Sequence, residues 1–123
     1  MIYNEDEYKV VFYTDRHGRQ PVIDYINELD DKDQSKITKY IDYLRLNNGY
    51  LDEPYSRHIN GKIRELRVDF SHNCHRIFYF TFINKKIVLL HAFLKNTEKT
   101  PLSELAKAEK YYEHVIINRQ LYE

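Results

Sequence analysis

The fold is decided by residues 63–94, which read IRELRVDFSHNCHRIFYFTFINKKIVLLHAFL. Runs rich in β-branched and aromatic residues predict three strands here, at Ile63–Phe70, Arg76–Ile83 and Ile87–Leu94. The linker between the last two strands is only residues 84–86, short enough for an antiparallel hairpin. The centre of the chain therefore predicts a small antiparallel sheet.

Helical patterns flank these strands on both sides. Apolar residues at helical spacing predict helices at Pro21–Leu29, at Lys32–Leu46 and, capped by its first residue, at Ser103–Ile117. A further strand is predicted at Lys9–Tyr13, and Leu51–Asn60 is expected to be a loop. The resulting order, β-α-α-β-β-β-α, predicts an α+β fold with a small antiparallel sheet and helices packed on one face.

Length and composition narrow the class of protein. The 123 residues fit one domain, 1–123, and no apolar run reaches the ~18 residues of a membrane span. The N-terminus lacks the basic start and apolar stretch of a secretory signal. Cys74 is the single cysteine, which excludes a disulfide framework, and His72 and His75 beside it lack a second ligand pair for zinc. We expect a cytoplasmic protein that needs no cofactor and no metal.

A net charge of zero hides a strong asymmetry along the chain. Residues 57–100 contain nine Lys or Arg against three Asp or Glu, whereas residues 1–56 contain seven against twelve. Cations at the ends of apolar strands indicate a local phosphate-binding surface, and the four in question are Arg67, Arg76, Lys95 and Lys99. The alternative interpretation is a solvated rim of charges.

Strand alternation predicts which side chains share a face. In the first central strand, Glu65 and Arg67 should point outward, away from the core, while Arg64 lies near a strand end. In the third strand one face should carry Ile87, Leu89, His91 and Phe93. If the register permits, His91 and Phe93 join Glu65 and Arg67 on a concave patch. A buried histidine with satisfied partners and a solubilising arginine remain the alternatives for these positions.

Three segments resemble the HigB toxins of the RelE-like superfamily, in the branch of phage-derived Gp49-like proteins. The first is Gly61-Lys62-Ile63-Arg64-Glu65-Leu66-Arg67, and the second is His75-Arg76-Ile77-Phe78-Tyr79-Phe80. The third is Leu90-His91-Ala92-Phe93-Leu94-Lys95-Asn96-Thr97-Glu98-Lys99-Thr100-Pro101. The resemblance covers about residues 8–115, and it departs from relatives in the neutral total charge and in Arg64, where an aromatic or aliphatic residue is expected.

The resemblance implies the toxin of a type II toxin–antitoxin system, an mRNA interferase that cuts mRNA in the ribosomal A site. A helix-turn-helix antitoxin, similar to HigA, would be its partner. By the same resemblance Arg67 and Arg76 hold the scissile phosphate, and Lys95 is the basic residue after the last strand. Glu65 and His91 fall where members of the superfamily vary.

RNA carries its own nucleophile, the 2′-hydroxyl next to the scissile phosphate, so such an enzyme needs no covalent residue. The candidate catalytic residues are Arg67 and Arg76 for charge stabilisation, Glu65 or His91 as base, and Lys95 or His91 as acid. The candidate RNA-binding residues are Arg64, Tyr79, Phe93 and Lys99, with Tyr79 or Phe93 stacking on a base. Two alternatives stay open: a non-catalytic RNA- or protein-binding module, and a ribonuclease that works without ribosomes.

Overall fold

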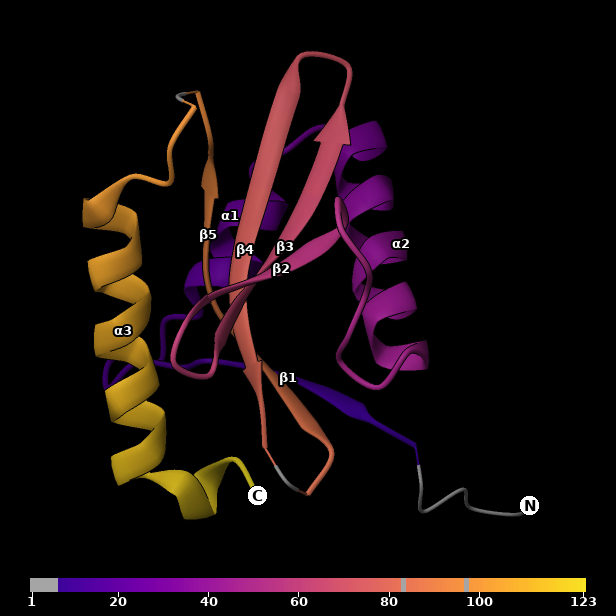
Figure 1. Cartoon of the computed structure of the whole chain (residues 1–123). Helices are drawn as coiled ribbons and strands as arrows, with labels where there is room; N and C mark the ends of the chain where they lie inside the picture. The colour runs from indigo at the N-terminus through magenta and orange to yellow at the C-terminus, as the bar shows by residue number, and fades with distance from the viewer. Residues whose placement is uncertain (1–6, 83, 97) are drawn as a thin grey trace.

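The computed structural model describes residues 7–82, 84–96 and 98–123, and these form one five-stranded sheet (Figure 1). The strands are β1 (Lys9–Phe12), β2 (Ser56–Asn60), β3 (Ile63–Phe70), β4 (Asn73–Thr81) and β5 (Lys86–Leu94). Their order in the sheet is β1-β5-β4-β3-β2. All neighbours are antiparallel except β1 and β5, which are parallel. The predicted α+β class with a mainly antiparallel sheet is confirmed.

Strand β2 corrects the expectation of a loop at Leu51–Asn60. Ser56 pairs with Leu66 and His58 with Arg64, and a turn through Gly61, at φ +56°, connects β2 to β3. The segment is short and mostly polar, so it shows no alternation of apolar and polar residues, and the preceding Pro54 indicates a loop. Its strand conformation comes from the backbone hydrogen bonds of its partner, which a local pattern does not reveal. The order of elements is therefore β-α-α-β-β-β-β-α.

The three helices are α1 (Pro21–Asn27), α2 (Asp31–Leu46) and α3 (Leu102–Ile117), followed by a short 3₁₀ turn at Arg119–Leu121. Helix α1 begins with proline at its first position, as expected, and ends two residues early. Helix α2 begins where the Asp30 carboxylate accepts a hydrogen bond from the backbone N–H of Asp33, at 2.9 Å. The predicted capping role of Ser103 is wrong, because the residue preceding α3 is Pro101 and no side chain caps the helix. In the described ranges, no helix is long and apolar enough to cross a bilayer.

Helices cover both faces of the sheet, so the expectation of helices on one face is wrong. Figure 1 shows α2 and α3 on opposite sides of the strands. One buried layer joins α1 and α2 to Leu66, Ile77 and Leu89, and the other joins α3 to Phe78 and Leu90. Because the central strands are apolar on both faces, each face needs its own cover.

A β-bulge in β5 changes which residues share a face. Phe78 pairs with His91, but the next residue, Tyr79, pairs with Leu89, so Leu90 is the extra residue. Ile87 and Leu89 consequently face α1 and α2, whereas His91 and Phe93 face α3. The predicted common face of these four residues is therefore wrong at Ile87 and Leu89, because strict alternation does not survive the bulge.

Candidate functional site

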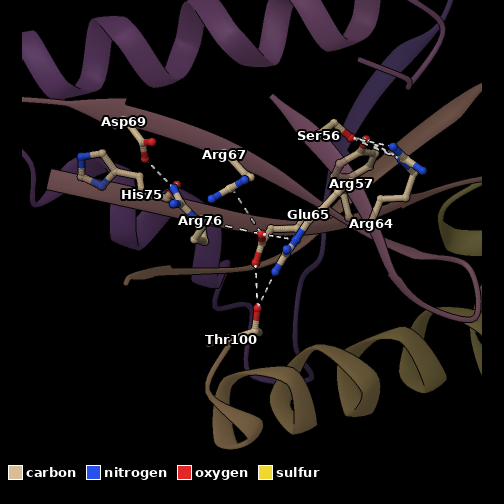
Figure 2. A network of polar contacts seen from close by, with 10 residues as sticks. Ser56, Arg57, Arg64, Glu65, Arg67, Asp69, His75, Arg76 and Thr100 are labelled. Carbon is tan, nitrogen blue, oxygen red and sulfur yellow. Dashed lines mark hydrogen bonds and ion pairs between the residues drawn. The ribbon is translucent and has the colours of Figure 1, made fainter. Parts of the chain in front are cut away.

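Four strands and a loop bring a group of cations together on the α3 side of the sheet. Arg67 of β3 and Arg76 of β4 are direct cross-strand partners. Arg57 of β2 is the cross-strand partner of Glu65, and Lys95 follows the last residue of β5. Thr100, in the loop before α3, contacts the same group (Figure 2). We call Arg57, Glu65, Arg67, Arg76, Lys95 and Thr100 the arginine cluster.

Glu65 lies at the centre of the arginine cluster. Its side chain is 0% exposed, and its Oε1 atom is 3.4 Å from the Nε of Arg57, 3.9 Å from that of Arg67 and 4.0 Å from that of Arg76. The Thr100 hydroxyl donates to the other carboxylate oxygen over 3.5 Å and accepts from Arg57 over 3.3 Å. Glu65 thus makes ion pairs with three arginines from three strands.

The prediction that Glu65 points outward, away from packed structure, is wrong. Glu65 and Arg67 do share a face, opposite to Leu66, as the alternation implies. That face, however, is packed: α3 covers it at Phe78 and Leu90, and Glu65 itself lies among the arginines and Thr100, so Glu65 is buried while Arg67 remains 26% exposed.

Arg76 is anchored more firmly than the other arginines. Its Nη1 donates to the Asp69 carboxylate at 2.6 Å and to the backbone carbonyl of His75 at 2.9 Å, and its side chain is 4% exposed. Burial raises the pKa of Asp69, but the hydrogen bond and charge of Arg76 outweigh it and hold that pKa below its usual value. Arg76 therefore presents a fixed orientation of its guanidinium group to the cluster.

Lys95 extends the arginine cluster beyond the end of β5. Its backbone N–H donates to the carbonyl of Cys74 at 2.8 Å, and the residue is buried. Burial lowers the pKa of the Lys95 ammonium, the charge of Glu65 opposes this effect, and the nearby arginines reinforce it. An ammonium with a lowered pKa gives up its proton more easily than an exposed lysine does.

His91 lies on the same face of the sheet but has other partners. Its Nε2 atom is 2.5 Å from the Glu104 carboxylate of α3, and its ring stacks on Phe93 at 6.0 Å between centroids. Burial lowers the pKa of His91, against the opposing effect of Glu104. Phe93, the cross-strand partner of Arg76, is itself buried against Phe78. The predicted stacking of Phe93 on an RNA base is therefore corrected, because its ring is in the core.

Arg64 and Tyr79 lie on the opposite face of the sheet from the arginine cluster. Arg64 donates to the Ser56 hydroxyl at 3.1 Å and to the Tyr79 hydroxyl at 3.3 Å, and its guanidinium lies 4.7 Å from the ring centroid of Tyr50. Tyr79 is 0% exposed, so its ring cannot stack on a base, and that expectation is corrected. The structure thus separates both residues from the site, whereas Lys99 is exposed in the loop that also carries Thr100.

Sequence reasoning missed Arg57 and Thr100 as members of the site. Arg57 contributed to the charge asymmetry, but it lay in a segment expected to be a loop. Thr100 is 35 residues from Glu65 and 43 from Arg57, so no local pattern connects them. The only signal was the Lys99-Thr100-Pro101 segment of the family resemblance.

In the part of the chain that the structure describes, no group of three or more His, Cys, Asp or Glu is arranged to hold a metal ion. A comparison with curated proteins found no match. A protein-family model described as "Phage derived protein Gp49-like (DUF891)" matches residues 24–113, which include every member of the arginine cluster. The chain therefore belongs to the phage-derived Gp49-like family, which is part of the RelE/HigB-like toxin group.

Proposed function

We propose that this protein is the toxin of a type II toxin–antitoxin pair, of the HigB kind, and that it cleaves mRNA on the ribosome without a metal ion. The observation that carries the proposal is the arginine cluster itself. Three guanidinium groups and a buried ammonium surround one carboxylate, so the positive charges outnumber the negative charge at the centre of the site. Membership of the Gp49-like family supports the choice of RNA as the polyanion.

The chemistry follows from what RNA supplies. Its 2′-hydroxyl loses its proton to solvent water and attacks the adjacent phosphorus, which adds negative charge to the phosphoryl oxygens as the bond to the 5′-oxygen breaks. Arg67 and Arg76 stabilise the added charge, since a guanidinium presents paired N–H donors to phosphate oxygens. Lys95 protonates the departing oxygen, a role that its lowered pKa favours.

The proposed partners are mRNA in the ribosomal A site and a helix-turn-helix antitoxin similar to HigA, and the proposed location is the cytoplasm. Co-expression tests the second partner. A small DNA-binding protein encoded beside the toxin should restore growth when both are induced.

The decisive experiment compares two substrates, translated mRNA and naked RNA, for the purified protein and two variants. Primer extension on translated mRNA should reveal new 5′ ends within codons, and naked RNA of the same sequence should stay intact. Lys95→Met should abolish these ends, whereas Lys110→Met, a change at an exposed lysine of α3, should leave them unchanged. Intact transcripts together with arrested growth would mean a non-catalytic blocker. Cleavage of naked RNA would mean a ribosome-independent ribonuclease.

A further inference from the structure

Glu65 was a candidate general base, but its surroundings do not suit that task. A base must lie within hydrogen-bond reach of the proton that it removes. The Glu65 side chain is 0% exposed, with one oxygen facing three arginine Nε atoms and the other facing the Thr100 hydroxyl. Figure 2 shows the carboxylate between the side chains of Arg57, Arg67 and Thr100. The carboxylate is therefore enclosed by protein atoms and is not exposed to a 2′-hydroxyl.

The contacts around Glu65 are ionic rather than well-formed hydrogen bonds. The Oε1 atom and the Nε atoms of Arg57, Arg67 and Arg76 are all buried, and none of the four has a hydrogen-bond partner. The three Nε–Oε1 distances of 3.4–4.0 Å exceed that of a good charged hydrogen bond, which is about 2.8 Å. The arginines are therefore gathered by charge attraction around a carboxylate that satisfies none of them fully.

We propose that Glu65 is a positioning residue: an internal counter-ion that holds the arginine cluster together in the free protein and competes with the RNA phosphate for it. The inference rests on the proposed function for the identity of the anion, but not for the role of the carboxylate. In the free protein the carboxylate offsets repulsion among Arg57, Arg67 and Arg76, whose Nε atoms are buried. When a phosphate arrives, the same charge repels it. Glu65 thus sets the affinity of the site rather than performing a proton transfer.

The counter-ion role and the base role predict different effects of Glu65→Gln: the first acts on binding, the second on the cleavage rate. The glutamine keeps the shape of the side chain and removes its charge, so an incoming phosphate meets a more positive site. We expect roughly tenfold tighter binding, an energy between that of a close pair of unit charges in bulk water and that of a close pair near a protein surface. Loss of a base, by contrast, lowers the cleavage rate whatever it does to binding.

The test measures binding of a 2′-O-methyl RNA oligonucleotide, which cannot be cleaved, at one fixed salt concentration. Glu65→Gln should bind about tenfold more tightly than the wild type. Glu109→Gln makes the same chemical change outside the cluster, at a carboxylate that accepts from Asn60, and should stay within twofold of the wild type. Where the wild type binds this RNA measurably, equal or weaker binding by Glu65→Gln overturns the proposal. If Glu65→Gln does not fold, Arg57→Gln/Glu65→Gln restores the charge balance and should fold, and failure of that variant also overturns it.

Inorganic phosphate separates this proposal from the proposed function. Phosphate should raise the melting temperature of Glu65→Gln more than that of the wild type, because the more positive site binds it more tightly. If neither protein binds the RNA but this difference appears, the RNA function fails and the counter-ion role stands. Equal shifts in the two proteins reject the counter-ion role, whatever happens with RNA.

Discussion

Arg64 and Arg67 form a matched pair for testing where the chemistry lies. Both belong to β3, three residues apart, so strand alternation places them on opposite faces of the sheet. Arg67 joins the arginine cluster, whereas Arg64 contacts Ser56, Tyr79 and Tyr50 on the α2 side. Replacing each by alanine removes the same charge from the same strand, but one variant should lose activity and the other should lose stability.

Arg67→Ala should lose activity and keep stability. Loss of one donor that stabilises transition-state charge costs about 10²–10³ in rate, or ~3–4 kcal/mol of activation free energy. Its ion pair with Glu65 spans 3.9 Å and its side chain is 26% exposed, so little stability depends on it. Removing it also relieves repulsion from Arg57 and Arg76. The free energy of unfolding should therefore change by less than about 1 kcal/mol.

Arg64→Ala should lose stability and keep activity. The variant loses charged hydrogen bonds to two buried hydroxyls, on Ser56 and Tyr79, and the stacking on Tyr50. Together these losses should lower the free energy of unfolding by about 1–3 kcal/mol. The corresponding fall in melting temperature is roughly 4–10 °C for a domain of this size.

Two measurements on each variant check the pair: urea unfolding, and primer extension on mRNA translated in vitro at a temperature where both variants are folded. Full cleavage by Arg67→Ala would refute the assignment of the site to this face. So would loss of cleavage by Arg64→Ala without any loss of stability, because that result would place the RNA on the α2 side.

Three further predictions follow from the environments of single residues. If Lys95 is the acid, the cleavage rate of the wild type should fall as the pH rises through the pKa of Lys95, which lies below the ordinary 10.5. Lys95→Arg should move that fall to higher pH. Identical pH–rate profiles for the two proteins would exclude Lys95 as the acid. Tyr25, whose hydroxyl is 2.7 Å from His75 Nδ1, has a pKa raised by burial from 10.0 to about 12. The unfolded chain therefore loses this proton first, so the free energy of unfolding should fall between pH 10 and 12. In Tyr25→Phe, urea unfolding should show a less steep fall, and an unchanged slope would contradict the burial of the Tyr25 hydroxyl. Gly49→Ala should lower the free energy of unfolding by roughly 1–3 kcal/mol, because Gly49 has φ +80° and an added Cβ would lie 2.6 Å from Thr81 Oγ1. Calorimetry should show that Gly49→Ala/Thr81→Ala recovers part of this stability. An unchanged stability in Gly49→Ala would show that the turn tolerates a side chain.

Local patterns predicted most of the elements because helices and strands depend on short-range periodicity. Strand β3 runs from Ile63 to Phe70, as its alternating residues indicate, and α2 and α3 begin within one residue of their predicted starts. The convergence of Arg67 and Arg76 was also predicted from their positions in neighbouring strands, and their side chains do meet at Glu65. Their catalytic roles, with that of Lys95, stay predictions.

Only the tertiary structure decided how the site is closed. The partners of the buried Glu65 come from β2, β4 and the Thr100 loop, and the strand that carries Arg57 exists through its pairing with β3. The bulge at Leu90 directs His91 and Phe93 toward α3, and a single extra residue reverses the faces on either side of it. The sequence by itself determined which residues are charged and which face of each element is apolar. The charged residues that meet in the site are separated by tens of residues in the sequence. Their arrangement is therefore selected by the free energy of the whole packed chain, and not by the preference of any one segment.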